Sequence, residues 1–176
     1  AGCNIAEKFA IHPQYEIYRI DSEKRPGKRF KLIPSCNSHE EYEKKCPSMK
    51  YFFRGLSGSC LFVVAGGGAI SGASLRIIEQ IKCEVSVLYL RPDVSLLSKK
   101  RGLQENVVFN VFQQYARSGL FKRMYIAENQ KLEQILGEVP VIGYHDKLND
   151  LLISTIHMAN YCENTKPELE TFDDAT

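Results

Sequence analysis

The sequence predicts an α/β domain of three layers with a mostly parallel sheet. Residues 59–65 form an unbroken apolar run, which is typical of a strand buried on both faces of a sheet. Three glycines follow, and residues 71–82 then carry apolar side chains at helical spacing. A second apolar, β-branched run at 83–90 completes a strand–helix–strand unit, whose crossover we expect to be right-handed. Parallel strands joined through helices define this fold class.

The beginning of the chain predicts a helix followed by a strand. Residues 4–10 carry apolar side chains at helical spacing, and residues 15–20 alternate in the pattern of a strand that ends at Asp21. Residues 24–31 are basic and contain proline and glycine, which predicts a solvated loop. An anion site is the alternative interpretation of this basic loop.

The later elements follow from capping signals and the same periodicities. Ser38 and Glu41 have the spacing of a capping box, so a short helix is expected over 38–45, before Pro47. Further helices are expected over 49–54, 103–115, 131–136 and 145–161, and a further strand over 124–127.

The composition indicates a soluble globular domain and argues against a nucleic-acid binder. Hydrophobic residues make up 44% of the 176 residues and charged residues 25%, a balance that supports one packed core. Lys and Arg number 23 against 21 Asp and Glu, so the formal net charge is only +2. Such a small charge does not create the field of a dedicated nucleic-acid binder, and we expect no nucleic-acid partner.

Targeting and metal-binding signals are weak. No run approaches the about 20 apolar residues of a membrane span, and no signal-peptide pattern is present, so we predict a cytoplasmic protein without a span. The six cysteines form no CxxC pair, which favours reduced thiols. Cys36, His39 and Cys46 could supply three zinc ligands, but no fourth is evident, and we assign no metal ligands.

The glycine turn after residues 59–65 is the clearest candidate for ligand binding. In open α/β sheets ligands bind beyond the carboxyl ends of the strands, and Gly66, Gly67 and Gly68 stand at such an end. Without Cβ atoms their amides can approach a phosphate, and the start of the next helix adds partial positive charge. The turn therefore predicts an anion site. A tight turn or close helix–sheet packing is the alternative explanation for these glycines.

Several motifs together resemble the tubulin/FtsZ family. Residues 62–65 followed by GGGAISG at 66–72 are similar to the signature loop of that family, and residues 2–4 resemble the end of its first glycine-rich loop. The other matching motifs are Arg91-Pro92, Lys99-Lys100-Arg101, Asn129 and Asn149-Asp150, in the family's order and with similar spacing. The resemblance covers nearly the whole chain.

The resemblance implies a nucleotide-binding protein with a Rossmann-like GTPase domain. Its ligand would be GTP or GDP with a magnesium ion, and its protein partner would be further copies of itself in a head-to-tail filament. Residues 1–162 would form the nucleotide-binding domain, including a long central helix at 145–161. Residues 163–176 would form an acidic loop or linker toward a second domain, and the abrupt ends indicate a fragment at both termini.

The resemblance also assigns roles to particular residues. Asn4 would lie in the first nucleotide loop, and Arg101 on the phosphate side of the nucleotide. Asn129 and Asn149 would contact the guanine edge, because an amide both donates and accepts hydrogen bonds. The implied nucleotide-binding residues are Gly2, Cys3, Asn4, Gly66, Gly67, Gly68, Ser71, Gly72, Arg101, Asn129, Tyr144, His145 and Asn149.

Simpler explanations exist for the residues outside the glycine turn. Tyr144 or His145 stands where the family stacks a ring on the base, but Asn149 could equally be part of the polar face of a helix. Arg101 could belong to a solvated basic run, and Asn129 could cap a helix. The joint order of the motifs favours the nucleotide-binding interpretation.

Three positions of the predicted nucleotide site depart from the family pattern. Ala69 and Ile70 replace a threonine and a glycine, which removes a hydroxyl and predicts backbone strain of about 1–2 kcal/mol at Ile70. Leu97 stands where the family usually has a glutamate that contacts the ribose. These departures weaken the predicted phosphate and ribose contacts.

The predicted catalytic residue lies near the end of the chain. In the family, acidic residues after the central helix act on the nucleotide of the neighbouring subunit. Asp173 matches the first acidic position of that pattern and would orient the attacking water, while Thr171 and Thr176 replace its other polar positions. A flexible acidic tail is the alternative.

The sequence thus supports one leading hypothesis and two rivals. The leading hypothesis is a tubulin/FtsZ-like protein that binds guanine nucleotide, assembles head to tail and hydrolyses GTP slowly in trans. The first rival is a non-catalytic structural or scaffold homologue, for example a viral one, that retains the fold. A Rossmann-type nicotinamide enzyme is less favoured because the glycine run lacks the GxGxxG pattern.

Overall fold

The computed structural model describes residues 2–25, 27–137 and 142–165, and within them all strand pairing is parallel. Strands β1 (Arg19–Asp21) and β2 (Phe30–Leu32) form one sheet. A second sheet has the order β3 (Ser59–Ala65), β4 (Glu84–Arg91) and β5 (Arg123–Glu128). The predicted α/β class with parallel strands is therefore confirmed.

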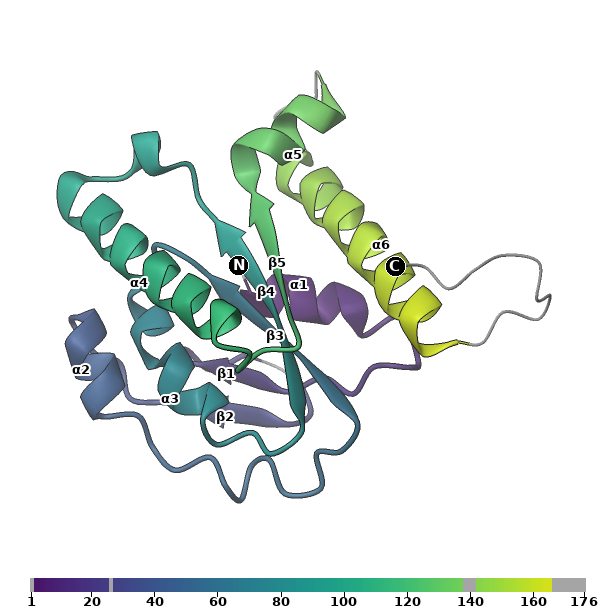
Figure 1. Ribbon diagram of the computed structural model, residues 1–176. Coiled ribbons are helices and arrows are strands. Elements are labelled where there is room, and N and C mark those ends of the chain that lie inside the picture. The colour runs from purple at the N-terminus through teal and green to yellow at the C-terminus, as the bar shows by residue number, and fades with distance from the viewer. Residues whose placement is uncertain (1, 26, 138–141, 166–176) are drawn as a thin grey trace.

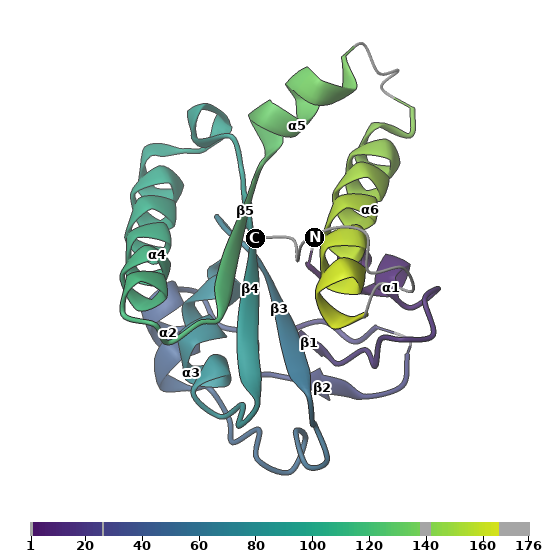
Figure 2. The ribbon, with the colours of Figure 1, turned by 45° about the vertical axis from the view of Figure 1, so that its right-hand side comes forward.

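Helices cover both faces of the larger sheet, which gives the predicted three layers (Figures 1 and 2). On one side lie α1 (Gly2–Phe9) and α6 (Tyr144–Asn164), and on the other α3 (Ser74–Ile78) and α4 (Lys99–Arg117). The remaining helical segments are α2 (His39–Lys44), α5 (Asn129–Leu136) and the 3₁₀ turns η1 (Ala69–Ala73) and η2 (Val94–Leu96).

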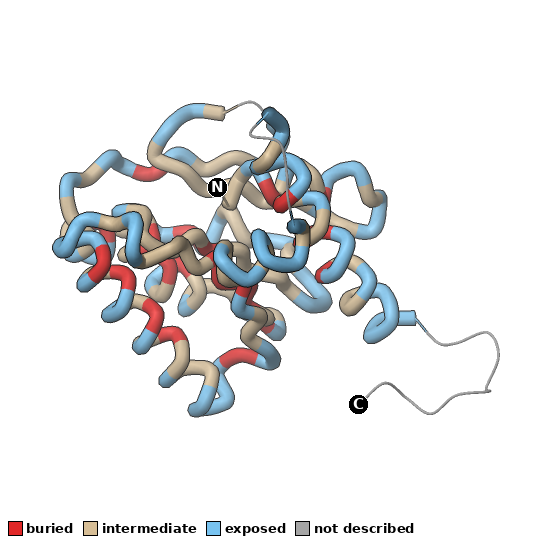
Figure 3. The backbone as a smooth tube through the Cα atoms, turned by 90° about the horizontal axis from the view of Figure 1, so that it is seen from above, coloured by how far each residue is buried: buried red, intermediate tan, exposed pale blue. Residues whose placement is uncertain are grey.

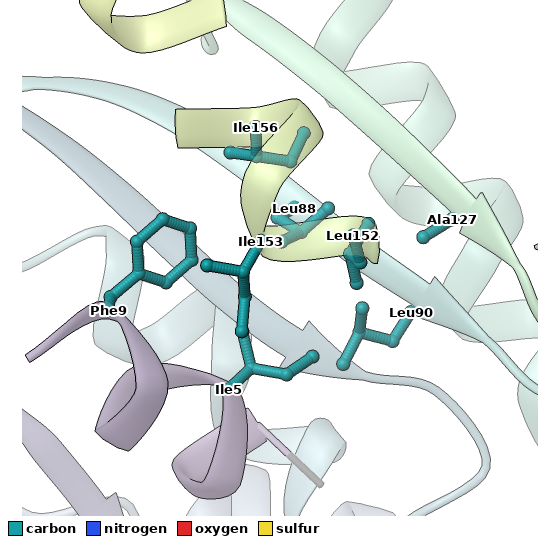
Figure 4. Packing of buried hydrophobic residues seen from close by; sticks show 8 residues of the cluster. All are labelled: Ile5, Phe9, Leu88, Leu90, Ala127, Leu152, Ile153 and Ile156. Atoms are coloured by element: carbon teal, nitrogen blue, oxygen red, sulfur yellow. The ribbon is translucent and has the colours of Figure 1, made fainter. Parts of the chain in front are cut away.

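The layer between the sheet and the pair α1 and α6 is built around a cluster of buried apolar side chains (Figure 4). Ile5 and Phe9 of α1 meet Leu152, Ile153 and Ile156 of α6 over Leu88, Leu90 and Ala127 of the sheet. Because α1 and α6 come from opposite ends of the sequence, this layer joins the two halves of the described chain.

The opposite layer is aromatic. Val87 and Tyr89 of β4, both with no exposed surface, pack against Phe109 and Phe112 of α4. The Tyr89 ring lies 5.3 Å from the Phe109 ring and 5.4 Å from the Phe112 ring, centroid to centroid. A third cluster, around Met49, packs α2 and η1 together and connects β1 to the rest of the fold.

The helix expected over residues 103–115 is longer at both ends in α4, and it buries one stripe of its surface. Its buried residues are Gly102, Glu105, Phe109 and Phe112, spaced at three and four positions. Leu103 and Val107 are 68% and 62% exposed. Figure 3 shows the same alternation of buried and exposed turns along the helices.

Several predicted elements have different bounds. The strand expected over 15–20 is confined to Arg19–Asp21, and the basic loop expected over 24–31 contains the start of β2. The helix expected over 71–82 begins as the 3₁₀ turn η1 and ends at Ile78. Residues 49–54 form turns without a helix, although Phe53 N–H donates to Met49 O at 2.9 Å.

The predicted central helix extends further than expected. Residues 145–161 are helical, but α6 continues to Asn164, past the expected domain end at residue 162. None of the helices in residues 2–25, 27–137 and 142–165 is long and apolar enough to cross a membrane.

The phase of α4 generates a stability prediction. Phe112→Ala should lower the free energy of unfolding by about 3–5 kcal/mol, because it removes a fully buried ring. Leu103→Ala, on the exposed side of the same helix, should change it by less than about 0.5 kcal/mol. Urea unfolding of both variants measures the difference. Equal losses would contradict this helix orientation.

Candidate functional site

The carboxyl ends of the parallel strands gather at one edge of the sheet (Figure 1). The glycine turn leaves β3 at this edge, η2 leaves β4, and α5 leaves β5. The first turn of α1 also lies here, because a Cβ atom on Gly2 would stand 3.4 Å from the carbonyl oxygen of Val63. Segments from distant parts of the sequence therefore meet at the edge where open α/β sheets bind ligands.

A cavity of about 740 Å³ opens beside β3 at this edge. It is lined by β1, β3, the start of α1 and the glycine turn, together with residues of η1, α3 and the segment before β1. The predicted site residues that line it are Gly2, Cys3, Gly66, Gly67, Gly68 and Ser71. Two motifs that the sequence connected only through a family resemblance thus share one cavity.

Two glycines of the turn are explained by the fold. A Cβ atom on Gly66 would lie 2.3 Å from Oε2 of Glu105, so a side chain here would have to displace the buried Glu105 carboxylate. Gly67 has φ +73°, a conformation that other residues adopt at a cost. A Cβ atom there would also approach Pro92 to 3.2 Å. Both positions need glycine whether or not a ligand binds.

Gly68 is different from its two neighbours. Its backbone is extended, with φ −89° and ψ 140°, which any residue can adopt. The nearest atom to a Cβ on Gly68 would be the Ala65 carbonyl oxygen, at 3.8 Å. The described part of the chain therefore gives no steric or conformational reason for glycine at this position.

The rest of the glycine loop serves internal packing. Ser71 is buried, and its hydroxyl donates a hydrogen bond of 2.6 Å to the Gly68 carbonyl oxygen. A Cβ atom on Gly72 would lie 2.5 Å from the backbone oxygen of His39, so glycine here allows α2 to pack closely. The strain predicted at Ile70 is absent, because among the described non-glycine residues only Arg29 has a positive φ. Ile70 instead packs in the cluster around Met49.

Arg25 reaches the same region from the loop between β1 and β2. Its Nη1 donates to Oδ1 of Asn4 at 3.0 Å, and its Nε donates to Oδ2 of Asp21 at 2.9 Å. Arg25 also lines the cavity, although sequence reasoning treated its loop mainly as a solvated connection. Burial, followed by the nearby Asp21 carboxylate, raises the pKa of the Cys3 thiol despite Arg25, so the thiol stays protonated at neutral pH.

Asn129 and Arg101 stand outside the cavity, at the starts of α5 and α4. Glu128, and not Asn129, occupies the N-cap position of α5, so the capping alternative for Asn129 is wrong. The residues on either side of Asn129 are tied to the end of β4: Arg91 Nη1 lies 3.2 Å from Glu128 Oε1, and Gln130 Nε2 donates to Asp93 Oδ2 at 2.9 Å. These contacts hold the backbone of Asn129. Arg101 is exposed in the first turn of α4.

The predicted base-contacting residues of α6 also lie outside the cavity. The Tyr144 hydroxyl hydrogen-bonds to Glu133 of α5, and this bond raises the pKa of Tyr144 to about 12. His145 is exposed beside the Tyr144 ring, at 5.2 Å between centroids, and Asn149 follows one turn later, half-buried. Asp173 lies outside the described residues.

Sequence reasoning missed a buried acid beneath the glycine turn. Glu105 of α4 has no exposed surface and accepts a hydrogen bond of 2.9 Å from the Tyr89 hydroxyl. Its Oε2 has no hydrogen-bond partner among the described residues. Burial raises the pKa of Glu105 and outweighs the opposing effects of Tyr89, the Gly67 amide and Arg91. The spacing of Glu105 from Phe109 and Phe112 was the signal for its burial.

Comparisons of the sequence with protein families and with curated proteins identify no relative. No model of a protein family matches the sequence, and no curated protein matches it significantly. The likeness of the motifs to the tubulin/FtsZ family therefore stays a prediction. Among residues 2–25, 27–137 and 142–165, no three His, Cys, Asp or Glu side chains gather as metal ligands, and this includes Cys36, His39 and Cys46.

The buried acid generates a pH prediction. Since folding raises the pKa of Glu105 above its ordinary 4.5, the folded state holds this proton more tightly than the unfolded state does. Its contribution to stability is therefore greatest below pH 4.5 and is lost as pH rises through the folded-state pKa. Glu105→Gln should remove this loss, so the melting temperature of the variant minus that of the parent should increase with pH.

Thermal unfolding of parent and variant from pH 4 to pH 8 measures this difference. Glu163→Gln is a matched control, because salt bridges lower the pKa of exposed Glu163 and its difference should run in the opposite direction. A difference for Glu105→Gln that is independent of pH would contradict the assignment.

Proposed function

We propose that this chain binds a guanine nucleotide at the carboxyl edge of its sheet, through a Rossmann-like domain similar to that of the tubulin/FtsZ family. Gly68 carries the proposal. None of the residues that the structure describes explains a glycine at this position, yet Gly68 lines the cavity at the edge where α/β sheets bind ligands. A phosphate approaching the backbone would supply the missing reason, because a side chain at 68 would obstruct it.

The other groups around this edge suit an anionic ligand. Gly2 and Cys3 line the same cavity as the glycine turn, and their small size leaves room for a ligand beside the backbone. The guanidinium of Arg25 lines the same cavity and is half-buried beside Asp21. A partly desolvated guanidinium binds phosphate more strongly than a fully solvated one does.

The base would be recognised beyond the ends of β5 and at the start of α6. Asn129 and Asn149 are half-buried amides, and the backbone on either side of Asn129 is held to β4 by Arg91 and Asp93. A guanine edge presents both donors and acceptors, which amides can match. Tyr144 or His145 would provide the stacking ring, and Arg101 would face the phosphates.

We further propose head-to-tail assembly, with Asp173 of one subunit orienting water at the nucleotide of the next. A magnesium ion would carry part of the phosphate charge when bound. The described residues offer no cluster of ligands for it, so phosphate oxygens and water would supply most of its coordination. The role of this chain would be to bind and orient the nucleotide.

One observation favours the alternative of a scaffold protein without turnover. Ser71 provides the hydroxyl that the glycine loop retains, and it is buried and already donates to the Gly68 carbonyl oxygen. Ala69 has none. A loop whose hydroxyl is buried and already donates its proton internally can hold phosphate through its amides, but this hydroxyl has no second proton to donate to a γ-phosphate.

The role of Gly68 can be tested by placing valine at two adjacent positions. Gly68→Val should weaken GDP binding tenfold or more, a change of about 1.4 kcal/mol or more, while its melting temperature stays within about 2 °C of the parent. Gly67→Val should lower the melting temperature clearly, because φ +73° is strained for a branched residue. Isothermal titration calorimetry measures the GDP affinity of each variant, and thermal unfolding measures its melting temperature. Unchanged GDP affinity in Gly68→Val would limit this glycine to a role in the turn.

Base selectivity gives a second test. GDP should bind at least about tenfold more tightly than ADP, because adenine would leave an amide hydrogen bond worth about 1–3 kcal/mol unmade. Asn129→Ala should reduce this ratio, whereas Asn110→Ala, on an exposed position of α4, should not. Equal affinities of the parent for GDP and ADP would reject guanine recognition.

Turnover distinguishes the two candidate functions. If Asp173 acts in trans, GTPase activity per molecule should rise with protein concentration, because assembly completes the site. Asp173→Ala should abolish this rise and leave GDP affinity unchanged. Phosphate release measured over a hundredfold range of concentration provides the test. GDP binding with no turnover at any concentration would favour the scaffold, and activity independent of concentration would reject catalysis in trans.

A further inference from the structure

The glycine turn lies between the cavity and the buried carboxyl group of Glu105. All three glycines of the turn line the cavity, whereas Glu105 does not. A Cβ atom on Gly66 would lie 2.3 Å from Oε2 and 2.7 Å from Oε1 of Glu105, so the carboxyl group lies directly against the turn. The backbone of the turn therefore separates this carboxyl group from a ligand in the cavity.

The core holds the Glu105 carboxyl group in this place. Glu105 has no exposed surface, and its Oε1 accepts a hydrogen bond of 2.9 Å from the Tyr89 hydroxyl. Burial raises the pKa of Tyr89, so this hydroxyl keeps its proton and remains a donor. A negative charge fixed at this depth would be screened far less by water and salt than a charge at the surface.

Few polar groups face the Glu105 carboxyl group. Burial has the largest effect on its pKa and raises it, while the Tyr89 hydroxyl, the Gly67 amide and the Arg91 charge act in the opposite direction. Arg91 is shared with Glu128, whose Oε1 lies 3.2 Å from its Nη1. No other charged side chain of the described residues affects the pKa of Glu105.

The amides of the turn have different surroundings. The Gly67 amide acts on Glu105 as a hydrogen-bond donor and favours its ionised form. Within the part of the chain that the structure describes, the Gly68 N–H makes no hydrogen bond, and Gly68 lines the cavity. An unpaired backbone donor beside a cavity is suited to an anionic oxygen. A phosphate bound there would lie across the turn from Glu105.

We propose that Glu105 is a positioning residue for the glycine turn and that its proton controls anion binding: the neutral carboxyl group permits a phosphate at Gly68, and the carboxylate opposes it. This inference rests on the proposed function, because it requires an anion at the turn. Two effects act in the same direction. The carboxylate repels the phosphate charge through the poorly screened interior, and it also draws the Gly67 amide toward itself.

The coupling predicts a pH dependence whose sign follows from the burial of Glu105. Since burial raises its pKa above the ordinary 4.5, Glu105 is neutral at low pH, and GDP affinity should be greatest there. The affinity should fall as pH rises through the folded-state pKa. By linkage, GDP binding should favour the protonated form, so GDP binding near that pKa should be accompanied by proton uptake at Glu105. A glutamate that serves only in packing would produce neither effect.

The affinity of GDP for the parent and three variants between pH 5 and pH 8 tests this proposal. The Kd of the parent divided by that of Glu105→Gln should rise about tenfold or more over this range, because glutamine stays uncharged. The titration of GDP itself cancels in this ratio. Tyr89→Phe should move the fall in affinity to higher pH, because it removes a hydrogen bond that lowers the pKa of Glu105. Glu163→Gln is the control, since Glu163 is an exposed acid paired with Lys122, and its ratio should not change with pH.

Calorimetry in buffers of different ionisation enthalpy provides a second measurement. Near the folded-state pKa, the parent should take up more protons for each GDP bound than Glu105→Gln does. If Glu105→Gln does not fold, the displaced pH profile of Tyr89→Phe relative to the parent supports the proposal, and an unchanged profile overturns it.

Failure of this proposal and failure of the proposed function give different results. GDP binding to the parent and to Glu105→Gln with a ratio independent of pH would overturn the role of Glu105 alone. Absence of GDP binding at every pH would overturn the proposed function and this inference with it. GDP binding that Gly68→Val leaves unchanged would also overturn both, because the anion would then lie away from the turn.

Discussion

The side chains of β4 alternate between two apolar layers, and the positions of the other elements follow from that alternation. Leu88 and Leu90 point toward α1 and α6, while Val87 and Tyr89 point toward α4. A strand buried on both faces can pair only with strands whose own side chains fit the same two layers. The register of β3 and β5 against β4 therefore fixes where the glycine turn and the start of α5 emerge.

The same strand connects the core to the candidate site. Tyr89 brings a hydroxyl into the aromatic layer, and a buried hydroxyl needs a partner, which Glu105 supplies. The Glu105 carboxyl group then occupies the volume where a side chain on residue 66 would lie. One glycine of the turn is thus required by the hydrogen bonding of the core. Because Gly67 needs glycine for its positive φ, only Gly68 of the three glycines remains free to be shaped by a ligand.

Long apolar runs made much of this fold predictable. The apolar runs at 59–65 and 83–90 correspond to the strands β3 and β4, and both strands were predicted almost to the residue. Short elements were not predicted. For example, β2 has only three residues, which include a lysine and an exposed leucine, and this is too few to show a hydrophobic period. The separate roles of Gly66, Gly67 and Gly68 were also hidden, since they depend on φ and on neighbours distant in sequence. Glu105 was overlooked because a charged residue is seldom buried.

The pairing of α1 with α6 has a consequence for the newly synthesised chain. The hydrogen bond between Tyr15 and His157 joins residues 142 positions apart, and the Lys8–Asp150 salt bridge spans the same separation. At about 5–20 residues per second, the ribosome needs roughly 7 to 30 s to make the intervening chain. During that interval Ile5 and Phe9 lack their partners from α6. The nascent segment that contains α1 is then accessible to chaperones and proteases. It can bury its apolar side chains only after α6 has been synthesised.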